Sequence, residues 1–94
     1  MSTRHIARTI VLQSLFEWDF NNGQKEITEI LKHVKKEFAP EFDDQNFSLN
    51  LIKNIVKNKK EIDKLIIKFA PEWPLDQISN VDRNILRIGI YELK

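Results

Sequence analysis

Apolar residues recur at helical spacing along almost the whole chain, and this periodicity restricts the possible folds more than any other feature. The clearest run follows an i, i+3, i+4, i+7, i+11 pattern and consists of Ile27, Ile30, Leu31, Val34 and Phe38. Residues that interrupt helices are scarce, because the 94 residues include only 2 glycines and 3 prolines. Helices joined by short loops fit both observations, so the sequence predicts an all-α fold.

A glycine and a proline bound the first two predicted helices. The first covers about residues 3–21 and stops at Gly23. Its apolar residues lie on two sides, so we expect it to be sandwiched between other helices. The second covers about residues 25–38, because Pro40 disfavours a helical conformation at Ala39.

Capping side chains mark the third and fourth helices. Asp43 or Asp44 can cap the third helix, and Asn58 ends it. Asn58 also stands three residues before Glu61, a capping-box-like arrangement that would open the fourth helix. The sequence therefore predicts two helices that meet at a single residue.

Prolines and a second capping box define the rest of the chain. Pro71 and Pro74 close the fourth helix, and Trp73 between them can anchor the loop by burial. After a short turn around residues 75–78, the box from Ser79 to Asp82 starts a fifth helix that reaches the end of the sequence. We expect one domain, with an N-terminal bundle at about 1–57 and the start of a second bundle at about 58–94.

Composition argues against several classes of protein. The chain has no cysteine, which excludes disulfides, thiol catalysis and cysteine zinc sites and fits a cytoplasmic location. The apolar runs are too short to cross a bilayer, so we expect no membrane partner. The sequence contains no glycine-rich phosphate loop, Ser/His/Asp arrangement or paired carboxylates, and His33 has no second metal ligand nearby. We therefore expect neither an enzyme nor a cofactor or metal.

The start of the first helix carries positive charge where a helix favours negative charge. Arg4, His5 and Arg8 all precede the first acid, Glu17, and exposed cations at a helix N-terminus cost roughly 0.3 to 1 kcal/mol each. The net charge of +1 gives no overall preference for nucleic acid, so only such local patches can indicate one. An anionic partner such as RNA would favour these cations. The alternative is surface charge on a frayed terminus.

The fifth helix has two apolar stripes and one polar arc at 100° per residue. One stripe consists of Val81, Ile85 and Ile88, and the other of Leu86, Ile90 and Leu93, with Gly89 between the two stripes. Two stripes require two neighbouring helices. The polar arc holds Arg83, Asn84, Arg87 and Tyr91. The spacing leaves two interpretations open. The arc either contacts RNA or is a solvated face in which Arg87 pairs with a carboxylate.

Two motifs resemble a known family. The first lies near the start of the chain and comprises Ala7-Arg8, Gln13, Leu15-Phe16 and Trp18. The second comprises Trp73-Pro74-Leu75, Ile78, Val81-Asp82-Arg83, Ile85-Leu86-Arg87-Ile88 and Tyr91-Glu92-Leu93. In order and spacing these motifs resemble the NusB transcription antitermination family over essentially the whole chain. The resemblance implies a non-enzymatic helical bundle that binds a short single-stranded RNA element, boxA, with the ribosomal protein NusE. It also implies an RNA polymerase complex that reads through terminators, notably in ribosomal RNA operons.

The resemblance also implies roles for individual residues. Phe16 falls at an RNA-contacting position where the family commonly has tyrosine, so stacking is retained but a hydroxyl hydrogen bond is not. Asp82 matches an acidic position at the RNA surface, although a capping role is the alternative. Gln13 is either a surface residue or a base-reading one. The expected RNA-binding residues are Arg4, His5, Arg8, Gln13, Phe16, Asp82, Arg83 and Arg87.

Other aromatic and basic residues are expected to be structural. Trp18 shares a stripe with Ala7 and Val11, which favours a core position, and Phe16 has the same alternative. The lysines of the third and fourth helices lie opposite the apolar stripes with no aromatic residue interleaved, which predicts solvated faces. They are Lys53, Lys57, Lys59, Lys60, Lys64 and Lys68.

One departure from the family pattern leaves further alternatives open. The sequence stops at Lys94, directly after Tyr91-Glu92-Leu93, whereas the family continues into more helices. We therefore expect a truncated family member whose fifth helix leaves an apolar patch that invites homodimerisation. The alternatives are the N-terminal RNA-binding module of a ribosomal RNA cytosine methyltransferase, and a helical protein-interaction module that does not bind RNA.

Overall fold

Five helices make up most of the residues that the computed structural model describes, which are 3–41, 46–72 and 78–93. They are α1 (Thr3–Phe20), α2 (Ile27–Phe38), α3 (Phe47–Lys57), α4 (Lys59–Phe69) and α5 (Asn80–Leu93). These ranges contain no strand, so the all-α prediction is confirmed. None of the helices in them is both long and apolar enough to cross a membrane.

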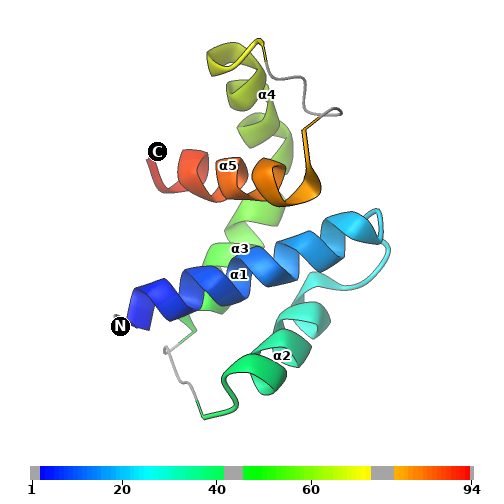
Figure 1. Cartoon of the computed structure of the whole chain (residues 1–94), viewed down its shortest axis with the longest axis vertical. Helices are drawn as coiled ribbons and strands as arrows, with labels where there is room; N and C mark the ends of the chain where they lie inside the picture. Colours follow the sequence, from blue (N-terminus) through cyan, green and yellow to red (C-terminus); the bar gives the residue numbers. More distant parts are fainter. Residues whose placement is uncertain (1–2, 42–45, 73–77, 94) are drawn as a thin grey trace.

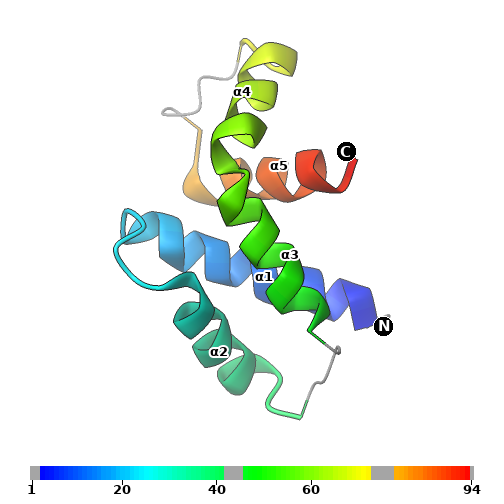
Figure 2. The same ribbon diagram turned by 180° about the vertical axis from the view of Figure 1, so that it is seen from behind.

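The first helix, α1, lies at the centre of the bundle. It contacts α2, α3 and α5, with α5 and α2 on opposite sides of it (Figure 1), and the view from behind shows α3 crossing in front of it (Figure 2). The helix α5 runs antiparallel to α1, so the start of α1 lies beside the end of α5. The predicted central position of the first helix is confirmed.

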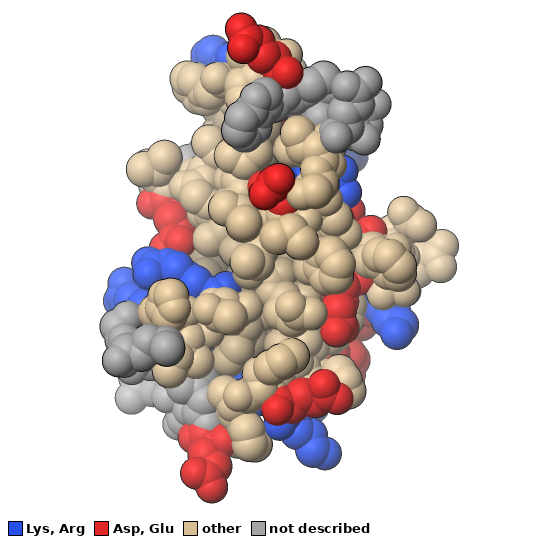
Figure 3. Space-filling view, viewed as in Figure 1, with Lys and Arg blue, Asp and Glu red and all other residues tan. Residues whose placement is uncertain are grey.

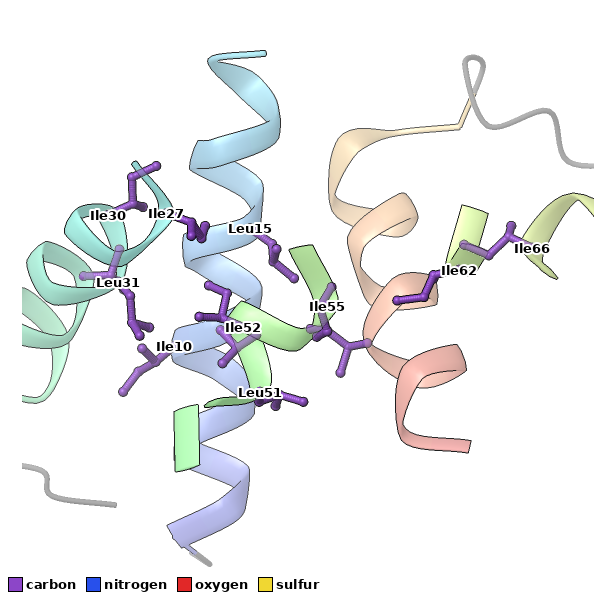
Figure 4. Packing of buried hydrophobic residues seen from close by; sticks show 13 residues of the cluster. Ile10, Leu15, Ile27, Ile30, Leu31, Leu51, Ile52, Ile55, Ile62 and Ile66 are labelled. Atoms are coloured by element: carbon purple, nitrogen blue, oxygen red, sulfur yellow. The ribbon is translucent and has the colours of Figure 1, made fainter. Parts of the chain in front are cut away.

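A single aliphatic cluster joins the five helices. In Figure 4, Leu15 of α1 and Ile52 and Ile55 of α3 occupy the middle, with α2 on one side and α4 and α5 on the other. Burying each such side chain stabilises the fold by about 1.5 to 3 kcal/mol relative to leaving it exposed. The predicted α2 stripe is buried except for Phe38, which is 67% exposed at the end of the helix.

The end of α1 is fixed by a Schellman motif. The N–H of Gly23 donates to the carbonyl of Trp18 at 2.9 Å, and the N–H of Asn22 donates to that of Asp19 at 3.0 Å. Both Asn22 (φ 58°) and Gly23 (φ 72°) adopt the left-handed conformation. The predicted stop at Gly23 is confirmed, with Asn22 as the first residue beyond the cap.

The two predicted capping boxes differ in outcome. The N–H of Asp82 donates to Ser79 Oγ at 3.1 Å, so the cap of α5 is confirmed. The side chain of Asn58 does not cap α4, and that prediction is wrong. Its amide Nδ2 instead donates to the carbonyl of Asn54 at 2.8 Å, the same carbonyl that accepts the backbone N–H of Asn58 at 3.0 Å.

Some predictions fall where the structure gives no description. Asp43, Asp44, Trp73 and Pro74 lie outside the described residues. The residue before α3 is Asn46, whose side chain makes no capping hydrogen bond. Pro71 is described, and α4 ends two residues before it, as the proline predicts.

Candidate nucleic-acid interface

One side of α1 faces outwards along the whole helix. Its residues share about a quarter of the helix circumference, and we call this side the outer face of α1. The outer face consists of His5, Thr9, Gln13, Phe16 and Phe20. His5, Thr9 and Phe20 are exposed, and Gln13 and Phe16 are half-buried, whereas Ala7 and Val11 on the opposite side are buried. The structure thus brings four of the predicted RNA-binding residues, His5, Gln13 and Phe16 with the neighbouring Arg8, to one side of one helix.

Arg8 is held at the edge of this face by α5. Its Nε lies 3.0 Å from each carboxylate oxygen of Glu92, and its Nη2 lies 2.8 Å from Glu92 Oε2. The hydrogen bond and the negative charge of Glu92 raise the pKa of Arg8 above its ordinary value. Within the described residues the Nη1 group of Arg8 makes no hydrogen bond, so this side of the guanidinium remains available to a phosphate.

Arg4 lies over an aromatic ring from another helix. Its guanidinium carbon is 4.9 Å from the ring centroid of Phe47, a cation–π distance that connects the start of α1 to the start of α3. Arg4 itself is exposed. Basic side chains gather over the start of α1, while the middle of this face of the molecule is largely uncharged (Figure 3).

A hollow separates the outer face of α1 from α5. It has a volume of about 200 Å³ and is lined by Leu12 with His5, Arg8 and Thr9 from α1, and by Ile85 and Ile88 from α5. Its polar residues come from α1 and its apolar ones mostly from α5. This arrangement suits a ligand that offers both charged groups and flat apolar surface.

The predicted polar arc of α5 faces inwards. Arg87 is only 3% exposed, and it donates from Nε and Nη2 to Asp63 at 2.9 and 3.1 Å and from Nη1 to Asp19 at 2.9 Å. Arg83 Nε donates to Asp19 at 2.9 Å, and Asn84 is fully buried. We call these five residues the inner charge network.

Two corrections to the sequence interpretation follow from this network. The pairing of Arg87 with a carboxylate is confirmed, but the arc is not solvated, because acids from α1 and α4 supply its partners inside the bundle. Conversely, Val81 and Ile85 of one apolar stripe are exposed. The guanidinium of Arg87 is therefore not placed where RNA could contact it, and Arg83 is largely engaged by Asp19.

Opposing influences act on Asp19 within the network. Burial alone would raise the pKa of its carboxyl, but the hydrogen bond from Arg83 and the charges of Arg87 and Arg83 outweigh burial and lower that pKa below its ordinary value. Asp19 therefore remains ionised and holds the end of α1 against α5.

The start of α5 lies beside the second half of α1. The side-chain amide of Asn80 donates to the carbonyl of Phe16 at 3.3 Å, and Asp82 is exposed in the first turn of α5. Asp82 and Phe16 thus lie at one end of the α1–α5 pair, and Arg8 lies toward the other.

Besides the contact of Arg4 with Phe47, sequence reasoning missed two aromatic features in the second half of α1. Phe20 is 73% exposed, and its ring stacks on that of Phe16 with centroids 6.3 Å apart. The i, i+4 spacing of the two residues is the signal that could have identified this pair. Trp18 packs partly buried against the core and also lines a hollow of about 490 Å³ with Lys57, Lys59 and Lys60. These lysines therefore do have an aromatic neighbour, which comes from α1.

The fold and the outer face define the class of this protein as a small all-helical bundle built around its first helix. Comparison with known proteins specifies the class further. The model of the NusB family matches residues 5–94, so this chain belongs to the NusB family.

Similar proteins agree with this assignment. The chain is 38% identical over 92 residues to a protein of Dehalococcoides mccartyi strain 195. The aligned region covers 98% of this chain and 63% of the relative. It is also 33% identical to a protein of a Nitratiruptor species and to one of Leptospira biflexa. These alignments cover 99% and 100% of this chain, respectively, and 66% of each relative. All three are called Transcription antitermination protein NusB. No solved structure matches the chain. The chain spans a little under two thirds of the relatives' length.

Proposed function

We propose that this protein binds a boxA-like single-stranded RNA through the outer face of α1. We further propose that it acts with NusE in an RNA polymerase antitermination complex that promotes read-through, notably of ribosomal RNA operons. The observation that carries the proposal is the alignment of Arg8, His5 and Phe16 along one outward side of one helix. The names of the relatives support the same process.

The cationic end of α1 would hold the RNA backbone. Arg4 and His5 are exposed, and Arg8 directs Nη1 away from Glu92. Arginine contacts to phosphate fix the register and orientation of a strand without reading its sequence. These residues would therefore supply most of the affinity and its dependence on salt.

The middle and far end of the outer face would read bases. Phe16 offers a half-buried ring for stacking, and Gln13 offers an amide that both donates and accepts hydrogen bonds. The carboxylate of Asp82, at the same end as Phe16, can accept a hydrogen bond from a base amino group such as that of cytosine. Sequence preference would come from these three residues.

Arg83 and Arg87 have a structural role in this proposal. Both bind Asp19, and Arg87 also binds Asp63. They fix α5 against α1 and thereby hold the first turn of α5, with Asp82, at the same end of the helix pair as Phe16. Because Arg87 is buried, it is not among the proposed RNA-contacting residues.

Fluorescence anisotropy with labelled boxA-like and scrambled RNA, each with and without NusE, tests the proposal. We expect tighter binding of the boxA-like strand and a further gain when NusE is present. Equal affinity for both strands would indicate a general polyanion binder, and an absence of binding at low salt would indicate a helical module that does not bind RNA. Either result would overturn the proposal.

A further inference from the structure

We propose that Phe16 and Phe20 form a stacking platform for one unpaired base of the bound strand, with Phe20 as its exposed contact. This inference rests on the proposed function and adds a binding residue to it. The ring centroids are 6.3 Å apart and the ring planes differ by 29°, so the pair presents two nearly parallel aromatic surfaces. Phe20 is the last residue of α1 and is 73% exposed.

The position of the pair continues the cationic side of α1. Phe20 shares the outer face with His5 and Thr9, and it lies 12 residues beyond Arg8. At a rise of 1.5 Å per residue the two are about 18 Å apart along the helix axis. A strand held by phosphate contacts at the start of α1 would reach the rings by following the same helix. Proteins that bind single strands combine such a cationic track with aromatic surfaces on which bases stack.

The acid that directly precedes Phe20 is compensated by cations of α5. Asp19 precedes Phe20 and would repel phosphate if its carboxylate were unpaired. Its Oδ2 instead accepts hydrogen bonds from Arg83 at 2.9 Å, Arg87 at 2.9 Å and Asn84 at 3.2 Å. The inner charge network therefore compensates the acid that directly precedes Phe20 in the chain.

Other exposed phenylalanines lack this combination of features. Phe38 is 67% exposed at the end of α2, where it borders a hollow next to Gln13. Phe69 is 69% exposed, and the ammonium group of Lys68 lies 5.7 Å from its ring centroid. In the described part of the chain, the only ring pair is the one on the outer face of α1. Phe69 is therefore a matched control for Phe20, since it has similar exposure and a similar place at a helix end, and its helix α4 makes no contact with α1.

The test measures binding of a boxA-like oligoribonucleotide that carries 2-aminopurine at successive positions. We expect wild-type protein to quench the fluorescence of one position by stacking, and Phe20→Ala to remove this quenching and weaken binding about five-fold or more. Phe20→Leu should weaken binding similarly, because it retains an apolar side chain without a π-face. Phe20→Trp should retain both binding and quenching, and Phe69→Ala should leave both unchanged.

Several results would overturn the platform. One is wild-type affinity and quenching in both Phe20→Ala and Phe20→Leu, and another is an equal loss in Phe69→Ala. If Arg4→Glu/Arg8→Glu weakens binding while Phe20→Ala does not, the platform fails and the proposed function survives. If wild-type protein binds no RNA, both fail. Circular dichroism of each variant shows that the helices are retained, as expected for a substitution at an exposed position.

Discussion

Two sets of arginine–carboxylate contacts join α1 to α5, and they differ mainly in their access to water. Near the start of α1 and the end of α5, the Arg8–Glu92 pair has side chains that are 43% and 28% exposed. At the other end, the Arg87 side chain is 4% exposed and its partner Asp19 is 16% exposed. The chemistry and the distances, 2.8 and 2.9 Å, are nearly the same.

The difference in exposure implies different roles. An exposed ion pair contributes only about 0 to 1 kcal/mol, so a phosphate can compete for its cation at little cost to the fold. A buried arginine that loses its partners leaves charge without water or a counter-ion, which is costly. The Arg8–Glu92 pair can therefore exchange partners, whereas the inner charge network fixes the angle between α1 and α5.

The largest expected effect comes from breaking the inner charge network. Arg87→Ala removes the donors that satisfy Asp19 and Asp63, and we expect a loss of about 3 to 5 kcal/mol in the free energy of unfolding. Urea denaturation measures this loss. Arg8→Ala is the matched control and should change the urea midpoint far less, because its ion pair is exposed to solvent. Equal losses in the two variants would contradict the distinction between the two regions.

The second prediction concerns the cationic end of α1. Replacing Arg4 and Arg8 together with glutamate should weaken RNA binding by roughly 1 to 3 kcal/mol. The slope of log affinity against log salt should fall by about 0.7 for each lost phosphate contact. Lys32→Glu/Lys36→Glu changes the charge equally on the exposed side of α2 and is the control. If the control weakens binding as much, the affinity depends on net charge and not on the start of α1.

The third prediction uses pH to test the inner charge network. Because the folded-state pKa of Asp19 is lowered, its ionisation stabilises the fold above its unfolded pKa of about 3.9, and this contribution disappears as pH falls through the folded value. The stability advantage of wild type over Asp19→Asn should therefore shrink as pH falls below about 3.9. Urea midpoints across this range provide the measurement. An advantage that stays constant with pH would show that the carboxylate charge is not what holds the network together.

The sequence predicted local structure better than it predicted which side of a helix is buried. Periodicity located α2, and Ser79 was correctly assigned as a cap because its partner lies three residues away. The inward orientation of Arg87 was not predictable in this way, because its partners stand 24 and 68 positions away in the chain. Without those acids in view, a polar arc beside two apolar stripes suggests a solvated surface.

The candidate site was only partly accessible to sequence reasoning, for a similar reason. The placement of Arg4 and His5 at the start of α1 followed from their position in the chain, and both are exposed. The contact between Arg4 and the ring of Phe47 joins two helices and has no local signal. Phe20 did have a local signal in its spacing from Phe16, and its exposure emerged only from the packing.

The smallest expected effect tests whether the Arg8–Glu92 pair can exchange partners or is a fixed link between α1 and α5. Glu92→Gln keeps the shape of the side chain but removes the charge that pairs with Arg8, so stability should fall by no more than about 1 kcal/mol. If phosphate and Glu92 compete for the same guanidinium, RNA affinity should rise, by up to about five-fold, which corresponds to about 1 kcal/mol. Anisotropy measured on both proteins at equal salt tests this expectation. A lower affinity would mean that Glu92 orients Arg8 for the phosphate. The Arg8–Glu92 pair would then resemble the inner charge network in fixing geometry.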